Sequence, residues 1–248
     1  MRKYLIAVVA ALTALAAVGI ANAQTGGSGG GGAEVTVSVS PSKVGTKKKP
    51  KPAKLTLEVK NEDSSQTADG LEVFVAKNIK TSFKGLKKCS AARLEAEGKS
   101  ACPSGSRVGA GTADAIAGVN TGAPAALRFN VTAFIIGANK IGFYLEQQGG
   151  EIRVMATGTF KRASGLYGSV LDVDIPQLAR EFPPGTFNGL VGLKTTLYKK
   201  VGKNSLLRSN GCPSTRNLPF KVVIHFMNNP NPPKAEEVEA TGTANCRR

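Results

Sequence analysis

Few residues in this chain have both the type and the spacing that catalysis requires. The single histidine, His225, lies in the segment FKVVIHFMN, whose pattern is typical of a β-strand. A serine–histidine mechanism needs the imidazole to be oriented beside a reactive serine, and the sequence indicates no such partner. A histidine in a strand is more often an ordinary sheet residue, so we expect no catalytic role for His225.

One pair of carboxylates has a spacing that chemistry could use. Asp172 and Asp174 lie two residues apart in SVLDVDIP, so a strand places them on one face, about 7 Å apart. Such a pair could serve glycoside hydrolysis or contribute to a calcium site. The simpler interpretation is a polar outer face opposite Leu171, Val173 and Ile175. A carboxylate-dependent hydrolase of cell-wall or polysaccharide material is therefore the alternative hypothesis, and it requires both residues to line a concave pocket.

The four cysteines are expected to form two disulfides. Cys89, Cys102, Cys212 and Cys246 form an even set in a chain that also carries an export signal. Three pairings are possible, and we favour Cys89–Cys102 with Cys212–Cys246 because each pair brackets a locally coherent unit. No Cys-x-x-Cys occurs and the histidine is remote in sequence, so we expect neither a metal site nor another cofactor.

Lysine-rich segments are the remaining candidates for binding. The formal net charge is +16, and it falls to +14 if Arg2 and Lys3 are removed with an export leader. A charge of that size attracts anionic partners such as cell-wall polymers or polysaccharide. Specific nucleic-acid recognition is not expected, because aromatic residues are not interleaved with the lysines. Solvated loops are the competing interpretation. The candidate polyanion-binding residues are Lys47, Lys48, Lys49, Lys51, Lys84, Lys87 and Lys88, and a further cluster is Lys199, Lys200 and Lys203.

The N-terminus predicts export. Residues 1–23 have a basic start, an apolar run at 5–20 and a small-x-small site that ends at Ala23. This pattern is typical of a Sec-type signal peptide cleaved near Ala23, and the run is shorter than the roughly 20 residues that span a bilayer. Residues 24–32 are rich in glycine and serine, as flexible linkers are. We therefore expect a secreted or cell-wall-associated protein with no integral membrane segment after cleavage.

The remainder, residues 33–248, has the pattern of β-structure. Apolar and polar residues alternate, as in AEVTVSVS, and turn residues separate the runs. No strand–helix alternation favours a parallel sheet. We predict an all-β fold, an antiparallel β-sandwich of about ten strands, built as one domain or as two packed β units. The expected strands cover residues 33–40, 54–60, 71–77, 107–119, 127–137, 140–147, 151–160, 169–176, 190–200, 219–228 and 238–246.

Residues 83–111 are the main departure from this strand pattern. Ser90 is a suitable N-cap and Gly98 a suitable C-terminal stop, so a short helix is expected between them. Cys89 and Cys102 would link the helix to its surroundings.

The strand after this helix carries unusually small residues. Gly109, Gly111 and Ala113 cannot fill a core themselves. We therefore expect either a bulky neighbour at this strand or a β-bulge in it.

The same cysteine-bracketed stretch resembles a segment found in uncharacterised exported proteins of high-GC Gram-positive bacteria. Their segment ends in a phrase like C-P-x-x-S-x-V-G-x-G-x-A, and Gly211-Cys212-Pro213 with Cys246 resembles their closing cysteine pair. The resemblance implies an extracellular β-rich domain with two disulfides. It implies no reaction and no catalytic residue. The matching residues are Cys89, Leu94, Cys102, Pro103, Ser106, Val108, Gly109, Gly111 and Ala113.

Together these patterns favour a non-catalytic exported protein of the cell envelope or extracellular space. We expect a binding, adhesion or structural module with weak electrostatic affinity for anionic polymers. The hydrolase described above is one alternative. A subunit of a surface assembly is another, and an exposed edge strand would support it.

Overall fold

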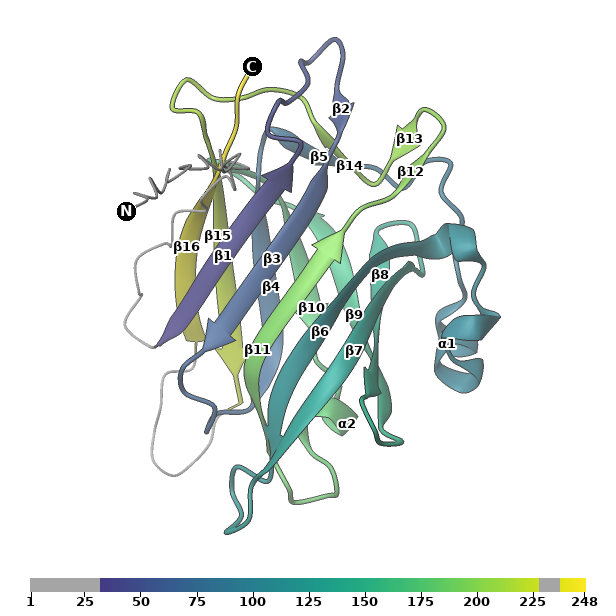
Figure 1. Ribbon diagram of the computed structural model, residues 1–248, viewed down its shortest axis with the longest axis vertical. Helices are drawn as coiled ribbons and strands as arrows, with labels where there is room; N and C mark the ends of the chain where they lie inside the picture. The colour runs from purple at the N-terminus through teal and green to yellow at the C-terminus, as the bar shows by residue number, and fades with distance from the viewer. Residues whose placement is uncertain (1–31, 228–236) are drawn as a thin grey trace, which may run out of the picture.

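The computed structural model describes residues 32–227 and 237–248, in which eleven long strands form the main sheet (Figure 1). The expected signal peptide, residues 1–23, and the linker up to residue 31 lie outside the described residues. The long strands are β1 (Ala33–Ser40), β3 (Lys54–Asn61), β4 (Ala68–Ala76), β6 (Arg107–Ala117), β7 (Ala125–Ile135), β8 (Lys140–Gln147), β9 (Arg153–Arg162), β10 (Tyr167–Asp174), β11 (Asn188–Leu197), β15 (Asn217–Phe226) and β16 (Glu237–Asn245).

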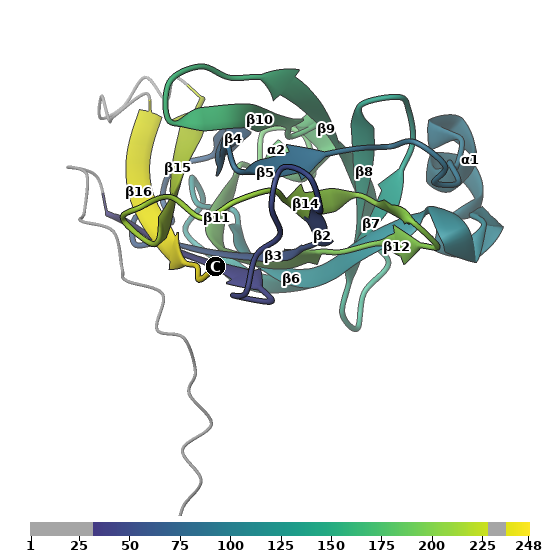
Figure 2. The ribbon, with the colours of Figure 1, turned by 90° about the horizontal axis from the view of Figure 1, so that it is seen from above.

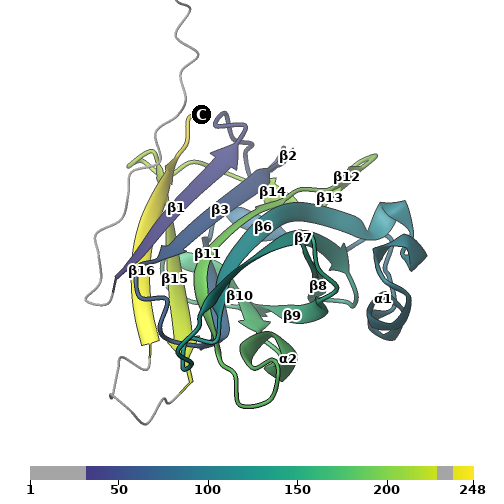
Figure 3. The ribbon, with the colours of Figure 1, turned by 60° about the horizontal axis from the view of Figure 1, so that its bottom comes forward.

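These strands form one continuous antiparallel sheet in the order β1-β3-β11-β6-β7-β8-β9-β10-β4-β15-β16. The sheet curls until its two edges, β1 and β16, lie side by side (Figure 3). A Cβ added to Gly242 of β16 would lie 3.6 Å from the carbonyl oxygen of Val35 in β1. The sheet is therefore nearly barrel-shaped. The predicted all-β antiparallel fold is confirmed, whereas a sandwich of two stacked sheets is not, because the long strands share one hydrogen-bonded sheet.

Alternating burial explains why these segments form strands. Val35, Val37 and Val39 of β1 are all buried, while the residues between them are partly or fully exposed. In the register of the sheet they lie opposite the buried Val59, Leu57 and Leu55 of β3. Burial of an aliphatic side chain of this size contributes about 1.5–3 kcal/mol relative to exposure. Repeated around the sheet, this pattern gives one core on the inner face.

Short strands that the sequence did not predict cover one end of the barrel-shaped sheet. β2 (Lys51–Pro52), β14 (Leu207–Ser209) and β5 (Ile79–Thr81) form a three-stranded sheet in that order. Seen from above in Figure 2, this small sheet lies across the opening. β12 (Lys200–Val201) and β13 (Asn204–Ser205) form a hairpin nearby. Strands of two or three residues are too short to show an alternating pattern, so no local signal indicated them.

Both expected disulfides and the expected helix are confirmed. Cys89 is bonded to Cys102 and Cys212 to Cys246. The helix α1 (Ala91–Glu97) begins after Ser90, whose hydroxyl accepts from the backbone N–H of Arg93. Gly98 ends it at a φ of 79°, in the region that favours glycine. Two one-turn 3-10 segments follow, η1 (Lys99–Ala101) and η2 (Ser104–Ser106). A small satellite core lies beneath α1 and contains Leu94, Phe134, Tyr144 and Met155.

The small residues of β6 have a close neighbour, but it is the backbone of the next strand and not the bulky group that was one of the two expectations. A Cβ on Gly111 would collide with the backbone carbonyl of Lys194, and one on Gly109 would lie 2.5 Å from the carbonyl oxygen of Thr196. The adjacent backbone of β11 therefore approaches too closely for any larger residue. The β6–β7 register also shifts between Arg107 and Gly109, so the strand is irregular as well.

The end opposite the small sheet carries a second helix that the sequence did not predict. α2 (Gln177–Arg180) follows β10 and lies beside the start of β11 (Figure 3). Asn188 holds it there, because its side-chain Nδ2 donates to the carbonyl oxygen of Ala179 at 3.1 Å. Across residues 32–227 and 237–248 no helix has the length and apolarity needed to span a membrane.

Candidate functional site

The small sheet brings together three basic strands that are far apart in sequence. β14 lies between β2 and β5, so Arg208 pairs with Pro52 on one side and with Lys80 on the other. Lys51 pairs with Ser209 in the same ladder. Lys51 and Lys80 are exposed, and Arg208 is half-buried. This sheet is the centre of the candidate site.

The first predicted lysine cluster lies at the edge of the small sheet. Backbone and side-chain bonds of 3.0 Å between Thr46 and Lys49 close the turn that carries Lys47 and Lys48. Ser209 of β14 anchors that turn, because its hydroxyl accepts from the backbone N–H of Gly45 at 3.1 Å. The turn is thus fixed at its base, and its lysine side chains are exposed.

The other two clusters join the same surface. The backbone N–H of Leu206 donates to the carbonyl oxygen of Lys199 at 2.9 Å, which places the β12–β13 hairpin directly before β14. Lys199 Nζ donates to the carbonyl oxygen of Ser104 at 3.1 Å. A Cβ on Gly105 would lie 2.9 Å from Cδ of Lys87, so the segment at 84–88 lies against the same loop. We call the combined surface the basic end; it comprises Lys47, Lys48, Lys49, Lys51, Lys80, Lys84, Lys87, Lys88, Lys199, Lys200, Lys203 and Arg208.

Among the described residues, no carboxylate forms an ion pair with a basic residue of this surface. The segments that build it, residues 43–57, 77–90 and 198–217, contain no Asp or Glu. The ion pairs found within the described residues all lie elsewhere, for example Lys60 with Glu34 and Lys194 with Glu58 on the outer wall. A surface that carries positive charge and no negative counter-charge projects its electrostatic field into the solvent.

Arg208 lies at the centre of this uncompensated charge. It is directly opposite Lys80 in the ladder, and like charges at such positions are destabilising. Its guanidinium donates through Nη2 to the carbonyl oxygen of Lys203. Its buried Nε has no hydrogen-bond partner among the described residues. An anionic group bound beside this pair would relieve the repulsion.

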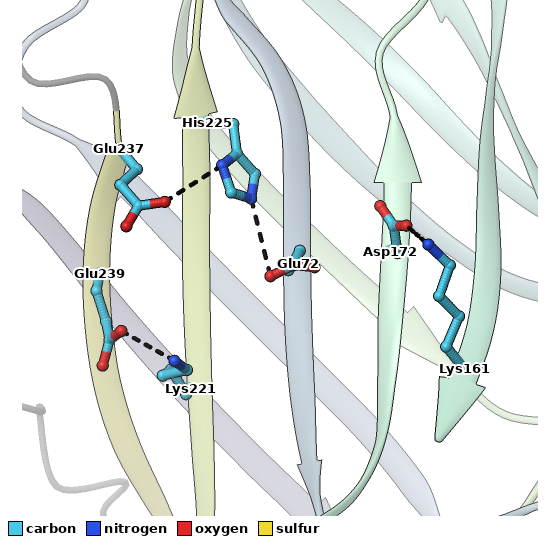
Figure 4. A network of polar contacts seen from close by, with 7 residues as sticks. All are labelled: Glu72, Lys161, Asp172, Lys221, His225, Glu237 and Glu239. Carbon is cyan, nitrogen blue, oxygen red and sulfur yellow. Dashed lines mark hydrogen bonds and ion pairs between the residues drawn. The ribbon is translucent and has the colours of Figure 1, made fainter. Parts of the chain in front are cut away.

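The carboxylate pair of the hydrolase hypothesis lies on the outer wall. Asp172 of β10 forms an ion pair with Lys161 of β9 (Figure 4), and the hydrogen bond between them raises the pKa of Lys161. Asp174 is exposed farther along the same strand. Neither residue lines a cavity found in the described chain. They therefore lie on the polar outer face that the alternation of polar and apolar residues in this strand predicted.

His225 belongs to the same outer wall. Its Nε2 lies 3.8 Å from a carboxylate oxygen of Glu72, and its Nδ1 lies 3.5 Å from one of Glu237 (Figure 4). Lys221 and Glu239 form a 2.9 Å pair beside it. The histidine is thus a cross-strand partner of carboxylates on a solvated face. In residues 32–227 and 237–248 no group of three or more His, Cys, Asp or Glu side chains could hold a metal ion.

Two residues of the basic end, Lys80 and Arg208, were not identified from sequence. Each is a single basic residue in a strand of three residues. The missed signal was the long stretch without carboxylates around each of them, at 73–94 and 182–235.

Comparisons with known proteins identify no relative. The sequence matches no protein-family model, and no curated protein or solved structure is similar to it.

Proposed function

We propose that this protein is a non-catalytic, exported binding protein that attaches to anionic polymers of the cell envelope or its surroundings through the basic end. The observation that carries the proposal is the gathering of basic residues from three separate segments without one carboxylate among them. Two disulfides agree with an oxidising compartment. The basic leader and cleavage site in the sequence support export.

The physical basis of the attachment is multivalent charge. Lysine ammonium groups on exposed turns act as mobile point charges, which tolerate variation in the spacing of anionic groups on a polymer. Arg208, held by its own strand and by Lys203, is the more fixed donor. Binding to a polyanion also releases its condensed counterions, so the affinity must fall as salt rises. Such a surface gives adhesion with modest selectivity for the polymer backbone.

The test uses one sugar backbone with and without charge. The chain lacking residues 1–23 is titrated with dextran sulfate and with neutral dextran over a series of salt concentrations. We expect binding to dextran sulfate alone, with a logarithm of affinity that falls linearly with the logarithm of salt concentration. Replacing Lys47, Lys48 and Lys49 by Gln should reduce the slope by up to about three units, at close to one unit per lost contact.

A matched control removes the same charge elsewhere. Lys60, Arg153 and Lys194 are exposed and lie on strands of the large sheet outside the basic end. Gln at those three positions should leave the slope close to that of the unmodified protein. Equal slopes for the two triple variants would show that only net charge matters, and would contradict a localised site. Binding that is absent, or that salt does not change, would overturn the proposal.

The geometry gives the two alternative functions no support. A hydrolase would need Asp172 and Asp174 in a concave pocket, and both lie on the outer wall. A surface assembly formed by strand addition would use an open sheet edge. The two edges of the large sheet, β1 and β16, instead lie against each other.

A further inference from the structure

The barrel-shaped sheet encloses a cavity that has no part in the basic end. Its volume is about 330 Å³, which is within the range of about 300–1,000 Å³ common for small-molecule sites. Side chains from β3, β4, β6 to β11 and α2 line it. Only Asn188 and Thr195 among the lining residues are polar, and none is charged.

The space arises from small residues on one strand. Ala113, Ala115 and Ala117 of β6 alternate along the wall of the cavity. Ala113 and Ala115 lie opposite the larger Phe129 and Leu127 of β7, whereas Ala117 lies opposite another alanine, Ala125. Interiors normally pack to the density of organic crystals, so a row of alanines at core positions leaves room that the chain itself does not fill.

The cavity opens beside α2. Leu178 and Phe182 line it, yet their exposed fractions are 48 % and 44 %. Large apolar side chains that are exposed and also line a cavity mark its rim. α2 lies at the end of the molecule opposite β2 and β14, so the rim is remote from the basic end (Figure 1). A ligand in the cavity and a polymer on the basic end would therefore occupy separate surfaces.

Thr195 places one polar group far from the rim. Asn188 begins β11 beside α2, and Thr195 lies seven residues farther along the strand, or about 20 Å. Beyond it Leu197 is buried in the core and does not line the cavity. Thr195 is only 6 % exposed, and its hydroxyl has no hydrogen-bond partner among the described residues. Rotation of χ1 by 120° can move the hydroxyl into the position that the methyl occupies, so the hydroxyl can be presented to a ligand.

We propose that the cavity binds a neutral, elongated and largely apolar small molecule whose leading end carries a hydroxyl or carbonyl group that bonds to Thr195. The apolar lining supplies the affinity through burial of hydrocarbon surface. The unpartnered hydroxyl supplies the selectivity, because a buried polar group gains most from a ligand that completes its hydrogen bond. The absence of any charged lining residue excludes a ligand that would bury a charge, since an unpaired buried charge is strongly unfavourable.

The test compares three probes that share one chain: 1-octanol, octane and octanoate. Binding to the chain lacking residues 1–23 is measured by titration calorimetry. We expect 1-octanol to bind most tightly, octane to bind, and octanoate to bind at least tenfold more weakly than 1-octanol. Thr195→Val should weaken 1-octanol about tenfold, which corresponds to about 1.4 kcal/mol, and should leave octane unchanged.

The same strand offers a matched control variant. Thr196 faces outward, where its hydroxyl lies 3.0 Å from that of Thr56, so Thr196→Val should leave the affinity for all three probes unchanged. Thr195→Val should also raise the melting temperature without a probe, by a few degrees, because it removes a buried unpartnered hydroxyl. That rise shows that the variant is folded.

Each outcome decides part of the proposal. If octane and 1-octanol both fail to bind, the cavity is no ligand site. If 1-octanol binds equally to the protein and to Thr195→Val, the role of Thr195 is wrong. If octanoate binds as tightly as 1-octanol, the requirement for a neutral ligand is wrong. None of these results depends on attachment to a polyanion, so the two proposals fail or succeed separately.

Discussion

The like-charge pair of Lys80 and Arg208 predicts a variant that gains stability while it loses binding. The two residues are direct cross-strand partners, and no carboxylate lies in the segments that build this surface. Opposed like charges cost about 0.2–1 kcal/mol, and opposed unlike charges gain a similar amount. Lys80→Glu replaces the like-charge pair with Arg208 by a pair of opposite charges. We therefore expect the free energy of unfolding to rise by about 0.4–2 kcal/mol, which is the sum of the two effects.

The assay is urea unfolding at low and high salt, together with the dextran sulfate titration. The gain in stability should shrink in 1 M NaCl, where the Debye length is only about 3 Å. Lys80→Gln removes the repulsion without adding attraction, so it should give about half of the gain. Affinity for dextran sulfate should fall with Lys80→Gln and fall further with Lys80→Glu.

The outer wall provides a control variant whose expected change in stability has the opposite sign. Lys60 lies directly opposite Glu34 in the β1–β3 ladder, and their charged groups are 3.5 Å apart. Lys60→Glu is the same substitution in a similar ladder, but it creates a like-charge pair and should lower stability. If Lys80→Glu instead lowers stability, or leaves polymer affinity unchanged, our account of the basic end is refuted.

Two further predictions concern the disulfides and the loop that follows α2. Replacing Cys212 and Cys246 by Ala should lower the free energy of unfolding by about 4 kcal/mol, from the loop-closure entropy of a 34-residue separation, and the urea midpoint measures this. Loss of the α1 disulfide should have a smaller effect on the midpoint, because α1 and its satellite core lie outside the main core. In the loop that follows α2, hydrogen bonds from the Gly185 backbone N–H and then from the Gln177 side chain lower the pKa of Glu181 below its ordinary 4.5. The stabilisation from these bonds should be complete above pH 4.5 and should be lost as the pH falls through the lowered pKa of Glu181. An NMR titration of the Gly185 amide should report this pKa, and Glu181→Gln should abolish the titration.

The large sheet was predictable strand by strand because its signal is local. Each expected strand is one of the eleven, with boundaries that move by only a few residues. The order of the strands was not predictable. β4 pairs with β10 and β15, which are far from it in sequence, and this placement depends on contacts that no local pattern encodes. A curled single sheet and a sandwich have the same alternation along each strand, so the sequence could not distinguish them.

The candidate site was predictable only where charge occurs in runs. Lys47 to Lys49 and the lysines at 84–88 and 199–203 were visible as clusters. Their association was not visible, because it depends on β14, whose three residues lie between β2 and β5. The cavity was not predicted. The glycines of β6 pack against the backbone of β11, and the cavity depends on side chains from many strands that only the three-dimensional arrangement brings together.

Both proposed sites contain groups that cost stability in the protein alone. Arg208 faces Lys80 without a counter-charge, and Thr195 buries a hydroxyl without a partner. Of the six unpartnered buried side-chain atoms in the described residues, Arg208, Asn188 and Thr195 contribute three. The other three atoms belong to Asn61, Ser169 and Arg180. On the outer wall, by contrast, cross-strand charges pair with charges of opposite sign. Real proteins break local rules mainly at functional sites, so we expect one bound anion and one neutral apolar molecule to relieve these costs at two different ends of the same sheet.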